Sequence, residues 1–351
     1  MPQNASLPAV PVAGGAPINT FENPNFLGEL FNISPRETPF STLIGGINGA
    51  EGLLAKDYSW QLEADEGDAN AAPTGISEGA DPTYSSVGRG EVMNTTQIFQ
   101  YGINITYTKL AATQQLGPQA AATRTEMVGG VHPAAGMNTA VTNELAHQTA
   151  LKLARMKKDV EKTFLTGTFQ RPLTAAEDGV NGIGGTERQM QGIIGGVAAA
   201  NAGLGGTADL PNDMEATFLQ LFDTSAAPLD ENYVIMVSPV DKVKFTKAYA
   251  ARGLLLPARG LRVAGVVAEE LVTDFGQFPV VINRWMPANT VLVVNLSVCK
   301  PKVLPIPGKG SVFTEELAHT GASLNFQLYG ELGLEYGPPT WHATVDSTLW
   351  T

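Results

Sequence analysis

Cysteine is nearly missing from this chain, since Cys299 is the only one among its 351 residues. A single thiol excludes an internal disulfide and every zinc site built from paired cysteines. Its neighbours Leu296 and Val298 predict a small, buried core residue. Charge is also scarce, because charged residues make up 16% of the sequence, against about a quarter in an average domain. Such a composition is typical of subunits that bury much of their surface in oligomers.

Basic residues are fewer than acidic ones, with 22 Lys and Arg against 34 Asp and Glu and a net charge of −12. This balance argues against direct nucleic-acid binding as the main role, although an acidic wall could face packed DNA and repel it. Residues 1–35 contain no Lys or Arg, so we expect no secretory signal peptide. The uncharged stretch 190–208 is rich in glycine, so we expect no membrane span there.

The familiar catalytic motifs are missing too. Four histidines occur, and none has the spacing of a metal or catalytic site: His132, His147, His319 and His342. The sequence holds no phosphate-binding P-loop. Residues 203–208 fit a relaxed dinucleotide-binding pattern, but no apolar strand precedes them, and we predict a loop there.

One acidic segment has enough carboxylates to attract calcium: Glu63, Asp65, Glu66 and Asp68. It lacks the glycine and the distal glutamate of an EF-hand, so a solvated acidic face is the better interpretation. We therefore predict no catalytic residue, no cofactor and no metal. An enzyme with an unusual carboxylate site stays open as an alternative, and a perturbed carboxylate pair in a deep pocket would support it.

Apolar residues do occur in the N-terminal segment, where no periodic pattern accompanies them. Residues 1–30 form a Pro-, Ala- and Gly-rich arm that would not fold alone. Its apolar residues suggest ordering against a neighbouring subunit, and the aromatic candidates for such contacts include Phe21, Phe26 and, just beyond the arm, Phe31. A disordered leader is the other interpretation.

Residues 56–108 resemble a long hairpin-like excursion. Alternation places Tyr58, Trp60 and Leu62 on one face of the first limb. The second limb alternates from Phe99 through Tyr101 to residue 107. The acidic connection 63–93 is far longer than an ordinary hairpin loop, so we expect it to lie on a neighbouring subunit. Trp60, Phe99 and Tyr101 are further candidate inter-subunit contacts, with packing inside the subunit as the alternative.

The clearest helix is predicted at 137–166, about 45 Å long. An apolar stripe recurs every three or four residues and ends at Phe164, and Gly167 stands in the favoured stop position. An alternating α/β region follows: a helix capped at Asn212, an apolar strand at 233–237, a helix from Pro239 capped by Ser238, and strands at 279–283 and 290–298. Residues 311–350 return to strand alternation and should pack on the long helix.

Three stretches together resemble the major capsid protein of tailed bacteriophages, which has the Hong Kong 97-type fold. The first is residues 32–44 with the motif NISPRETPF, the second is the helix with residues 143–146 (NELA) and 157–161 (KKDVE), and the third is residues 273–287 with TDFG and VVINR. Their order agrees over nearly the whole chain. The resemblance implies an α+β chain that assembles into pentamers and hexamers around the double-stranded DNA of a phage head.

The resemblance also assigns parts. Residues 1–35 would be the N-terminal arm, 52–110 the extended loop over an adjacent subunit, 111–211 with 300–351 the peripheral domain containing the spine helix, and 212–299 the axial domain. Because only a short arm precedes residue 32, a separate scaffolding protein is expected, with a portal and an optional decoration protein. DNA would be enclosed without sequence-specific contact and without a membrane. The protein would be made in the host bacterial cytoplasm and located in the virion.

Two other structural roles remain open at this point. The first is an encapsulin-like compartment, which has the same fold but encloses protein cargo. The second is a secreted or surface-layer protein, which the expected lack of a signal peptide disfavours.

Overall fold

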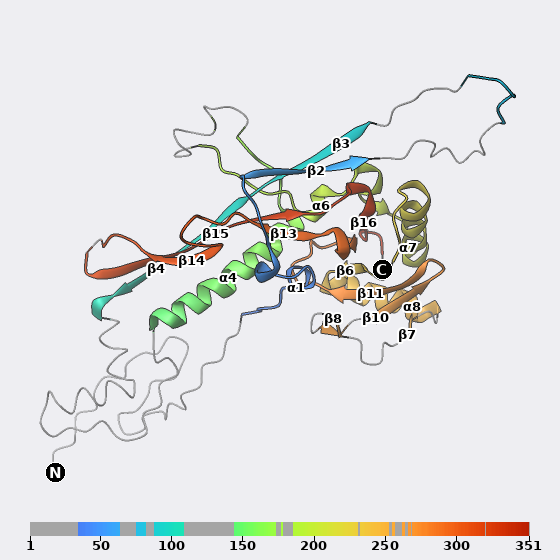
Figure 1. Ribbon diagram of the computed structural model, residues 1–351. Helices are drawn as coiled ribbons and strands as arrows, with labels where there is room; N and C mark the ends of the chain where they lie inside the picture. The colour runs from blue at the N-terminus through green and yellow to red at the C-terminus, as the bar shows by residue number, and fades with distance from the viewer. Residues whose placement is uncertain are drawn as a thin grey trace, which may run out of the picture. The chain divides into compact units, whose positions relative to one another are not determined.

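The computed structural model describes residues 34–63, 75–81, 88–108, 144–172, 177, 185–230, 232–252, 255–256, 262–263, 266–267, 269–319 and 321–350 (Figure 1). Two units divide the chain. The first comprises 1–35, 104–150 and 318–325, and the second comprises the remaining residues. In the first unit, the Asn104 side chain donates hydrogen bonds to Ser323 and Asn325. Everything below concerns the second unit, apart from the ends of α4, β4 and β15 that extend into the first.

The long helix α4 spans Glu144–Thr166. Met156, Val160 and Phe164 are each at most 1% exposed, which confirms the predicted stripe. The predicted end at residue 166 is also confirmed, whereas 137–143 lie outside the described residues. Gly167 follows because a Cβ there would lie 2.5 Å from the Met190 carbonyl oxygen, so only glycine fits.

A five-stranded sheet packs on α4. Its order is β1-β13-β15-β14, and β4 also pairs with β15. The strands are β1 (Glu51–Gly52), β4 (Gln97–Thr106), β13 (Lys300–Val303), β14 (Val312–Glu316) and β15 (Ser323–Glu335). Leu328, Leu332 and Leu334 of β15 share one buried cluster with Met156 and Val160 of α4. The prediction that the C-terminal strands return to the long helix is therefore confirmed for β15.

A seven-stranded mixed sheet has the order β5-β16-β12-β6-β11-β10-β7. The strands are β5 (Leu204–Gly205), β6 (Tyr233–Val237), β7 (Leu255–Leu256), β10 (Glu269–Thr273), β11 (Gly276–Ile282), β12 (Thr290–Asn295) and β16 (Ala343–Asp346). Alternate residues of β6 enter two different clusters, with Ile235 on the side of α7 and Met236 on the side of α4. Burial on both faces explains the unbroken apolar run of β6.

Short helices and turns complete the second unit. They are α1 (Pro39–Leu43), α6 (Ile193–Gly196), α7 (Leu210–Leu219), α8 (Pro239–Arg252), the 3₁₀ turns at Ile47–Gly49, Ala199–Asn201, Leu296–Val298 and Pro339–Trp341, and the π-helical turn Gln220–Thr224. A small ribbon pairs β8 (Arg262–Val263) with β9 (Val266–Val267). Among the described residues, no helix has both the length and the apolar character that crossing a membrane requires.

The hairpin prediction needs a correction. Strand β2 (Asp57–Glu63) pairs antiparallel with β3 (Arg89–Thr95), not with the predicted second limb. That limb is β4, which joins the five-stranded sheet through β15. Alternation correctly identified the buried faces of β2 and β4. It missed β3 because Arg89, Gly90 and Glu91 are exposed and supply no apolar period.

Three smaller predictions also differ from the structure. Helix α7 begins two residues before the expected cap, so Asn212 lies inside it and donates to Asp209. Strand β12 ends at Asn295, whose side chain accepts from the Ser297 amide and turns the chain. Residues 343–346 were predicted among the strands that pack on the long helix, yet β16 pairs with β12 in the seven-stranded sheet. Val345 and Ala343 are fully buried there.

Candidate assembly surfaces

The base of the β2–β3 hairpin is fastened to its own chain. Trp60 of β2 donates from Nε1 to the Gly337 carbonyl at 2.8 Å and packs edge-on against Tyr336 with ring centroids 5.0 Å apart. Tyr58 donates to the Leu334 carbonyl at 2.9 Å. A Cβ at Gly333 would lie 2.5 Å from the Tyr58 hydroxyl, so this glycine lets the hairpin approach β15 closely.

A buried polar junction connects β3 to β4. Asn94, Thr95 and Thr96 are fully buried. The Asn94 amide donates to the carbonyls of Leu334 and Gln191, and its oxygen accepts from the Gln191 amide. Because these buried groups satisfy one another, the junction fixes the direction in which the hairpin leaves the sheet.

An ion pair supports the same junction. Arg188 lies 3.2 Å from Glu331 of β15 and also donates to the Thr96 hydroxyl. Tyr329 donates to the other carboxylate oxygen of Glu331 at 2.7 Å. Both charged side chains are at most 15% exposed, so losing one partner would leave the other poorly solvated.

The outer half of the hairpin, in contrast, is exposed. Gln61 and Glu63 face solvent, as do the residues opposite them in β3. Glu63 makes an exposed ion pair with Arg89 at 3.4 Å. Residues 75–81 are exposed as well, and Ile76 keeps 79% of its surface accessible. A two-stranded ribbon alone is marginally stable in water, so this half suits a contact with another molecule.

The predicted contact residues have different positions. Phe99 is 5% exposed and belongs to the α4 cluster, which leaves it almost no surface for a neighbour. Tyr101 donates to Asp159 of α4 at 2.8 Å, and Trp60 packs as described. The structure brings Trp60 of β2 to the same core as Phe99 and Tyr101 of β4. Phe21, Phe26 and Phe31 lie outside the described residues.

A buried glutamate joins three distant segments. Glu161 of α4 is fully buried and accepts from the amides of Phe40 and Ser41 at 2.8 and 2.7 Å. It also accepts from the Asn283 side chain at 2.7 Å. Burial raises the pKa of Glu161, and the donated hydrogen bonds oppose that rise. These are the three stretches that carried the resemblance, and α4 holds the other two in place.

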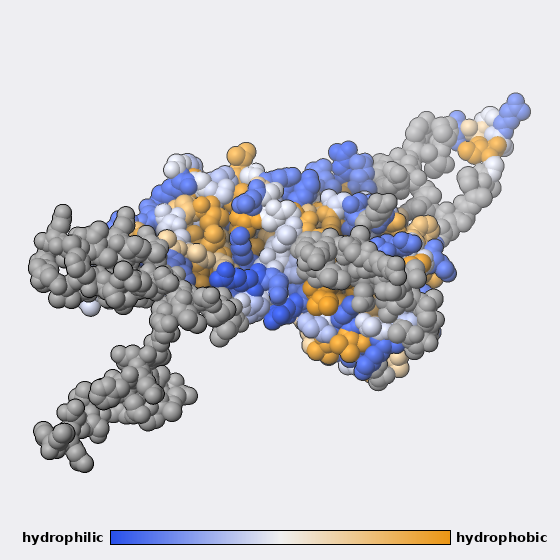
Figure 2. Space-filling view, turned by 90° about the horizontal axis from the view of Figure 1, so that it is seen from below, coloured by the Kyte–Doolittle hydropathy of each residue, from blue (hydrophilic) through white to orange (hydrophobic). Residues whose placement is uncertain are grey.

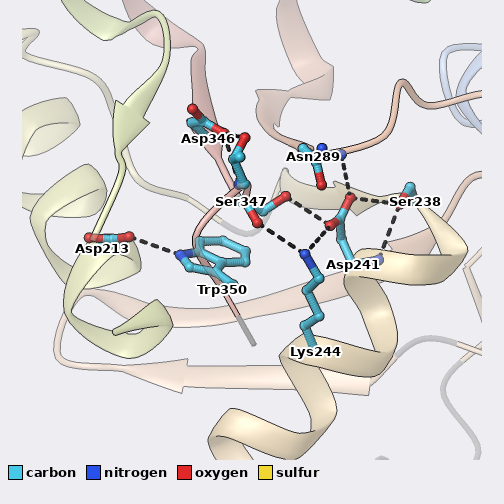
Figure 3. A network of polar contacts seen from close by, with 9 residues as sticks. Asp213, Ser238, Asp241, Lys244, Asn289, Asp346, Ser347 and Trp350 are labelled. Atoms are coloured by element: carbon cyan, nitrogen blue, oxygen red, sulfur yellow. Dashed lines mark hydrogen bonds and ion pairs between the residues drawn. The ribbon is translucent and has the colours of Figure 1, made fainter. Parts of the chain in front are cut away.

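A second buried carboxylate anchors the C-terminal segment (Figure 3). Asp241 of α8 accepts from the hydroxyls of Ser238 and Ser347 and from the Asn289 amide, with Lys244 at 3.8 Å. The Ser238 hydroxyl in turn accepts from the Asp241 amide, which confirms the predicted cap of α8. This network stabilises the fold and presents no nucleophile to a pocket.

The same segment is fixed a second time. Trp350 is 3% exposed and donates from its indole nitrogen to Asp213 of α7 at 2.9 Å (Figure 3). Asp213 also accepts from the Thr207 hydroxyl at 2.6 Å. Two carboxylates therefore bind residues 347–350 to the helices that cover the seven-stranded sheet.

Comparison with known proteins decides the family. The sequence model described as the SU10 major capsid protein matches residues 16–348. The chain belongs to the SU10 major capsid protein family. It is thus a major capsid protein of the phage type, and its place is the virion. No curated protein sequence matches it.

Solved structures agree on the fold. The capsid protein is similar to one in the cyanophage A-1(L) capsid asymmetric unit, with a TM-score of 0.58 and 12% identity over 93% of this chain and 97% of that one. It is also similar to a chain of the holo-SrpI encapsulin complex from Synechococcus elongatus PCC 7942. The TM-score is 0.54, and the identity is 12% over 94% of this chain and 95% of that one. A Gordonia phage Cozz structure scores 0.52 with 12% identity over 96% of both chains. The fold is the predicted Hong Kong 97 type.

Two titratable side chains of this capsid protein, those of His342 and Cys299, have structural roles. Burial lowers the pKa of His342 to about 4, and its ring bridges the Asn295 amide and the Tyr336 carbonyl. Cys299 is buried, as predicted, and burial raises the pKa of its thiol. Of the acidic segment, only Glu63 is described. Within the described ranges no group of His, Cys, Asp and Glu could hold a metal ion.

Sequence reasoning missed Asn94, Glu161 and Asp213. One signal existed for Glu161, because it directly follows Val160 in the apolar stripe of α4. The apolar spacing of Met214, Phe218 and Leu221 in the sequence would also bury Phe222. Phe222 is instead 58% exposed, with its ring centroid 5.8 Å from that of Phe275, because the helix passes into a π turn at residue 220.

Proposed function

We propose that this capsid protein assembles into the pentamers and hexamers of an icosahedral phage head that encloses double-stranded DNA. The observation that carries the proposal is the β2–β3 hairpin, which is rigidly fastened at its base and unsupported at its outer half. A rigid base aims the ribbon, and an exposed outer half provides a contact surface for a neighbour. Repeated around an axis, such a heterologous contact closes a ring.

Each part of the chain would form a different part of the capsid subunit. Residues 1–35 would be the arm, and 52–110 would contain the loop that overlies an adjacent subunit. Residues 111–211 and 300–342 would form the peripheral domain. Residues 212–299, joined by the C-terminal segment 343–350, would form the axial domain that meets at the centre of each pentamer or hexamer. The role is architectural, and we propose no catalysis.

Partners beyond the chain itself belong to this proposal as well. A separate scaffolding protein would guide assembly. A portal and a decoration protein would complete the head. The subunit would be made in the host bacterial cytoplasm, and the packaged DNA would make no sequence-specific contact.

Negative-stain microscopy and sedimentation of the purified chain test the proposal. The decisive variant replaces residues 64–88 by Asn-Gly, the two-residue turn that best closes a hairpin between β2 and β3. We expect wild-type protein, alone or co-expressed with its scaffold, to give uniform shells or rings of five and six. We expect the variant to keep its thermal melting temperature but form no shells. Normal shells from the variant would refute the role of the hairpin.

The arm is tested separately. Deleting residues 1–30 should abolish closed shells and leave the subunit folded, as judged by circular dichroism. Normal shells from this deletion would show that the arm is dispensable.

A second candidate function is an encapsulin-like compartment, which the likeness to the holo-SrpI encapsulin favours. The contents of shells purified after expression with the neighbouring genes distinguish the two. Nuclease-resistant DNA supports a phage head, and a stoichiometric protein cargo without DNA supports a compartment.

A further inference from the structure

Helix α4 is basic although the chain is acidic. Its 23 residues include five Lys or Arg and three acidic residues, of which Glu161 is buried and binds backbone amides. The whole chain carries a net charge of −12. A cationic surface in such a background calls for a specific explanation, because excess acid elsewhere would repel any polyanion that it attracts.

Four of these cations lie on one face, which we call the basic face: Lys152, Arg155, Lys158 and Lys162. At 100° per residue they fall within about 120° of one another, opposite the buried stripe. Their steps of three, three and four residues correspond to about 4.5–6 Å along the helix axis. Such a row of positive charges about 15 Å long can lie along a chain of phosphates.

Two of the four cations are held in position. Arg155 lies over the ring of Tyr101 at 5.5 Å, and Lys162 lies over the ring of Trp285 at 4.6 Å. Asp159 lies between them, 3.5 Å from Arg155 and 3.9 Å from Lys162. One carboxylate shared by two cations leaves the face with a net positive charge. The side chains of Arg155 and Lys162 nevertheless remain 62% and 49% exposed.

Helix α8 has three lysines, of which Lys247 is exposed and the other two are bound within the subunit. Lys242 is 7% exposed and lies over Phe245. Lys244 is bound to Asp241 and to the Ser347 carbonyl. The comparison indicates that exposure of the basic face is a feature of α4 and not of every lysine-rich helix here.

The basic face and the hairpin lie on opposite sides of β15. A Cβ at Gly330 would meet Met156 of α4, whereas a Cβ at Gly333 would meet Tyr58 of β2. Residues separated by an odd number in a strand point to opposite faces. Figure 1 shows the same arrangement, with β2 and β3 above the sheet and α4 below it. Figure 2 views this lower side, where hydrophilic areas interrupt the hydrophobic ones.

The acidic hairpin connection accentuates this asymmetry. Residues 64–88 contain five Asp or Glu and no Lys or Arg. In the sequence, the segment that joins β2 to β3 is therefore acidic, whereas the exposed face of α4 is basic. In a closed shell the two sides of a subunit meet different environments, and only the lumen holds a concentrated polyanion.

We propose that the basic face of α4 lines the shell lumen and binds the phosphate backbone of packaged DNA without reading its sequence. This inference rests on the proposed capsid function. It refines the expectation that an acidic wall only repels DNA. Contact with phosphates positions nucleic acid and carries no base information, which suits a shell that packages any sequence.

Two variants with equal loss of charge provide the test. The first replaces Lys152, Lys158 and Lys162 by Gln. The matched control replaces Lys247, Lys300 and Lys309 by Gln, which lie on α8, β13 and the β13–β14 connection. Binding of a mixed-sequence double-stranded DNA fragment to unassembled full-length protein is measured by fluorescence anisotropy over a range of NaCl concentrations.

We expect wild-type affinity to fall with salt, and the α4 variant to lose about one unit of the log–log slope per lysine, or about three in all. The control should keep the wild-type slope. An equal change of slope in both variants, or no DNA binding by wild-type protein at low salt, overturns the inference. Polyglutamate binding as tightly as DNA would assign the face to an acidic polypeptide and also overturn it.

A second readout separates this inference from the proposed function. Shells of each variant are treated with nuclease, and protected DNA per shell is measured. If all shells form normally and only those of the α4 variant protect less DNA, DNA binding by the basic face is supported. Equal amounts of protected DNA in wild-type, α4-variant and control shells overturn the inference. Failure of wild-type protein to form shells under any condition would instead contradict the capsid function.

Discussion

The seven-stranded sheet and the β2–β3 hairpin use opposite means of stabilisation. The sheet is apolar on both faces, and residues such as Ile235 and Val293 are fully buried between layers of the same chain. The hairpin is held by a few hydrogen bonds at its base, and its outer half contacts solvent. A core of the first kind folds alone, whereas a ribbon of the second kind gains most of its contacts only on assembly.

The largest expected change in stability comes from a substitution in the seven-stranded sheet. Phe278 of β11 is 1% exposed and stacks on Phe218 with ring centroids 4.5 Å apart. We expect Phe278→Ala to lower the free energy of unfolding by about 3–5 kcal/mol, because it leaves a cavity in a packed core. Urea denaturation measures the change. The control Gln277→Ala, at an exposed neighbouring position, should change stability by less than about 0.5 kcal/mol.

The next test uses pH. Burial lowers the pKa of His342 to about 4, whereas it titrates near 6.5 when unfolded. Between these values the unfolded state binds one more proton, so stability is lost as pH falls from about 6.5 to 4. The loss reaches about 3 kcal/mol. Melting temperatures over this range measure it.

Two variants refine the pH test. His342→Gln should flatten the pH dependence, and an unchanged profile would exclude His342 as its source. Glu161 acts in the opposite sense, because its raised pKa favours the folded state as pH falls. Glu161→Gln should therefore steepen the loss of stability at low pH.

A smaller effect is expected at the hairpin base. Asn94→Ala would leave the Gln191 amide and carbonyl without their partner, at a cost of about 1–3 kcal/mol. Assembly should suffer more than folding, because the junction aims the hairpin. Shell yield relative to melting temperature tests this, with Gln61→Ala on the exposed face as control. Loss of both quantities in parallel would mean that the junction serves folding only.

The smallest expected change is Trp60→Phe. The ring would still pack against Tyr336, but the hydrogen bond to the Gly337 carbonyl would be lost. We expect a loss of about 1 kcal/mol in unfolding free energy. A loss above about 3 kcal/mol would indicate that the base of the hairpin belongs to the folding core and would weaken the contrast drawn above.

The sequence predicted the helices and strands better than it predicted which strands pair. Periodicity located the end of α4, the faces of β2 and β4 and the buried strand β6, because burial leaves a local pattern. It could not pair β2 with β3, since alternation identifies a face and not a neighbour. Nor could it place β16 beside β12, because the paired residues Val293 and Ala343 lie 50 positions apart in the sequence.

The polar junctions were beyond prediction for a similar reason. Asn94 stands between Met93 and the polar run Thr95–Gln97, and nothing local distinguishes a buried asparagine from an exposed one. The resemblance to phage capsid proteins supplied the family and the order of the parts. It did not indicate that Glu161 binds the other two resembling segments, which only the coordinates of all three reveal.

The position of Glu161 also has a consequence for synthesis on the ribosome. Helix α1 leaves the exit tunnel early, but Glu161 follows about 120 residues later and Asn283 about 240 residues later. At roughly 5–20 residues per second, translation of the last of these segments lags by about 12–50 s. During that interval Phe40 has no buried site to occupy. A nascent capsid subunit therefore exposes an apolar N-terminal segment for longer than folding itself requires, which favours its capture by a chaperone while synthesis continues.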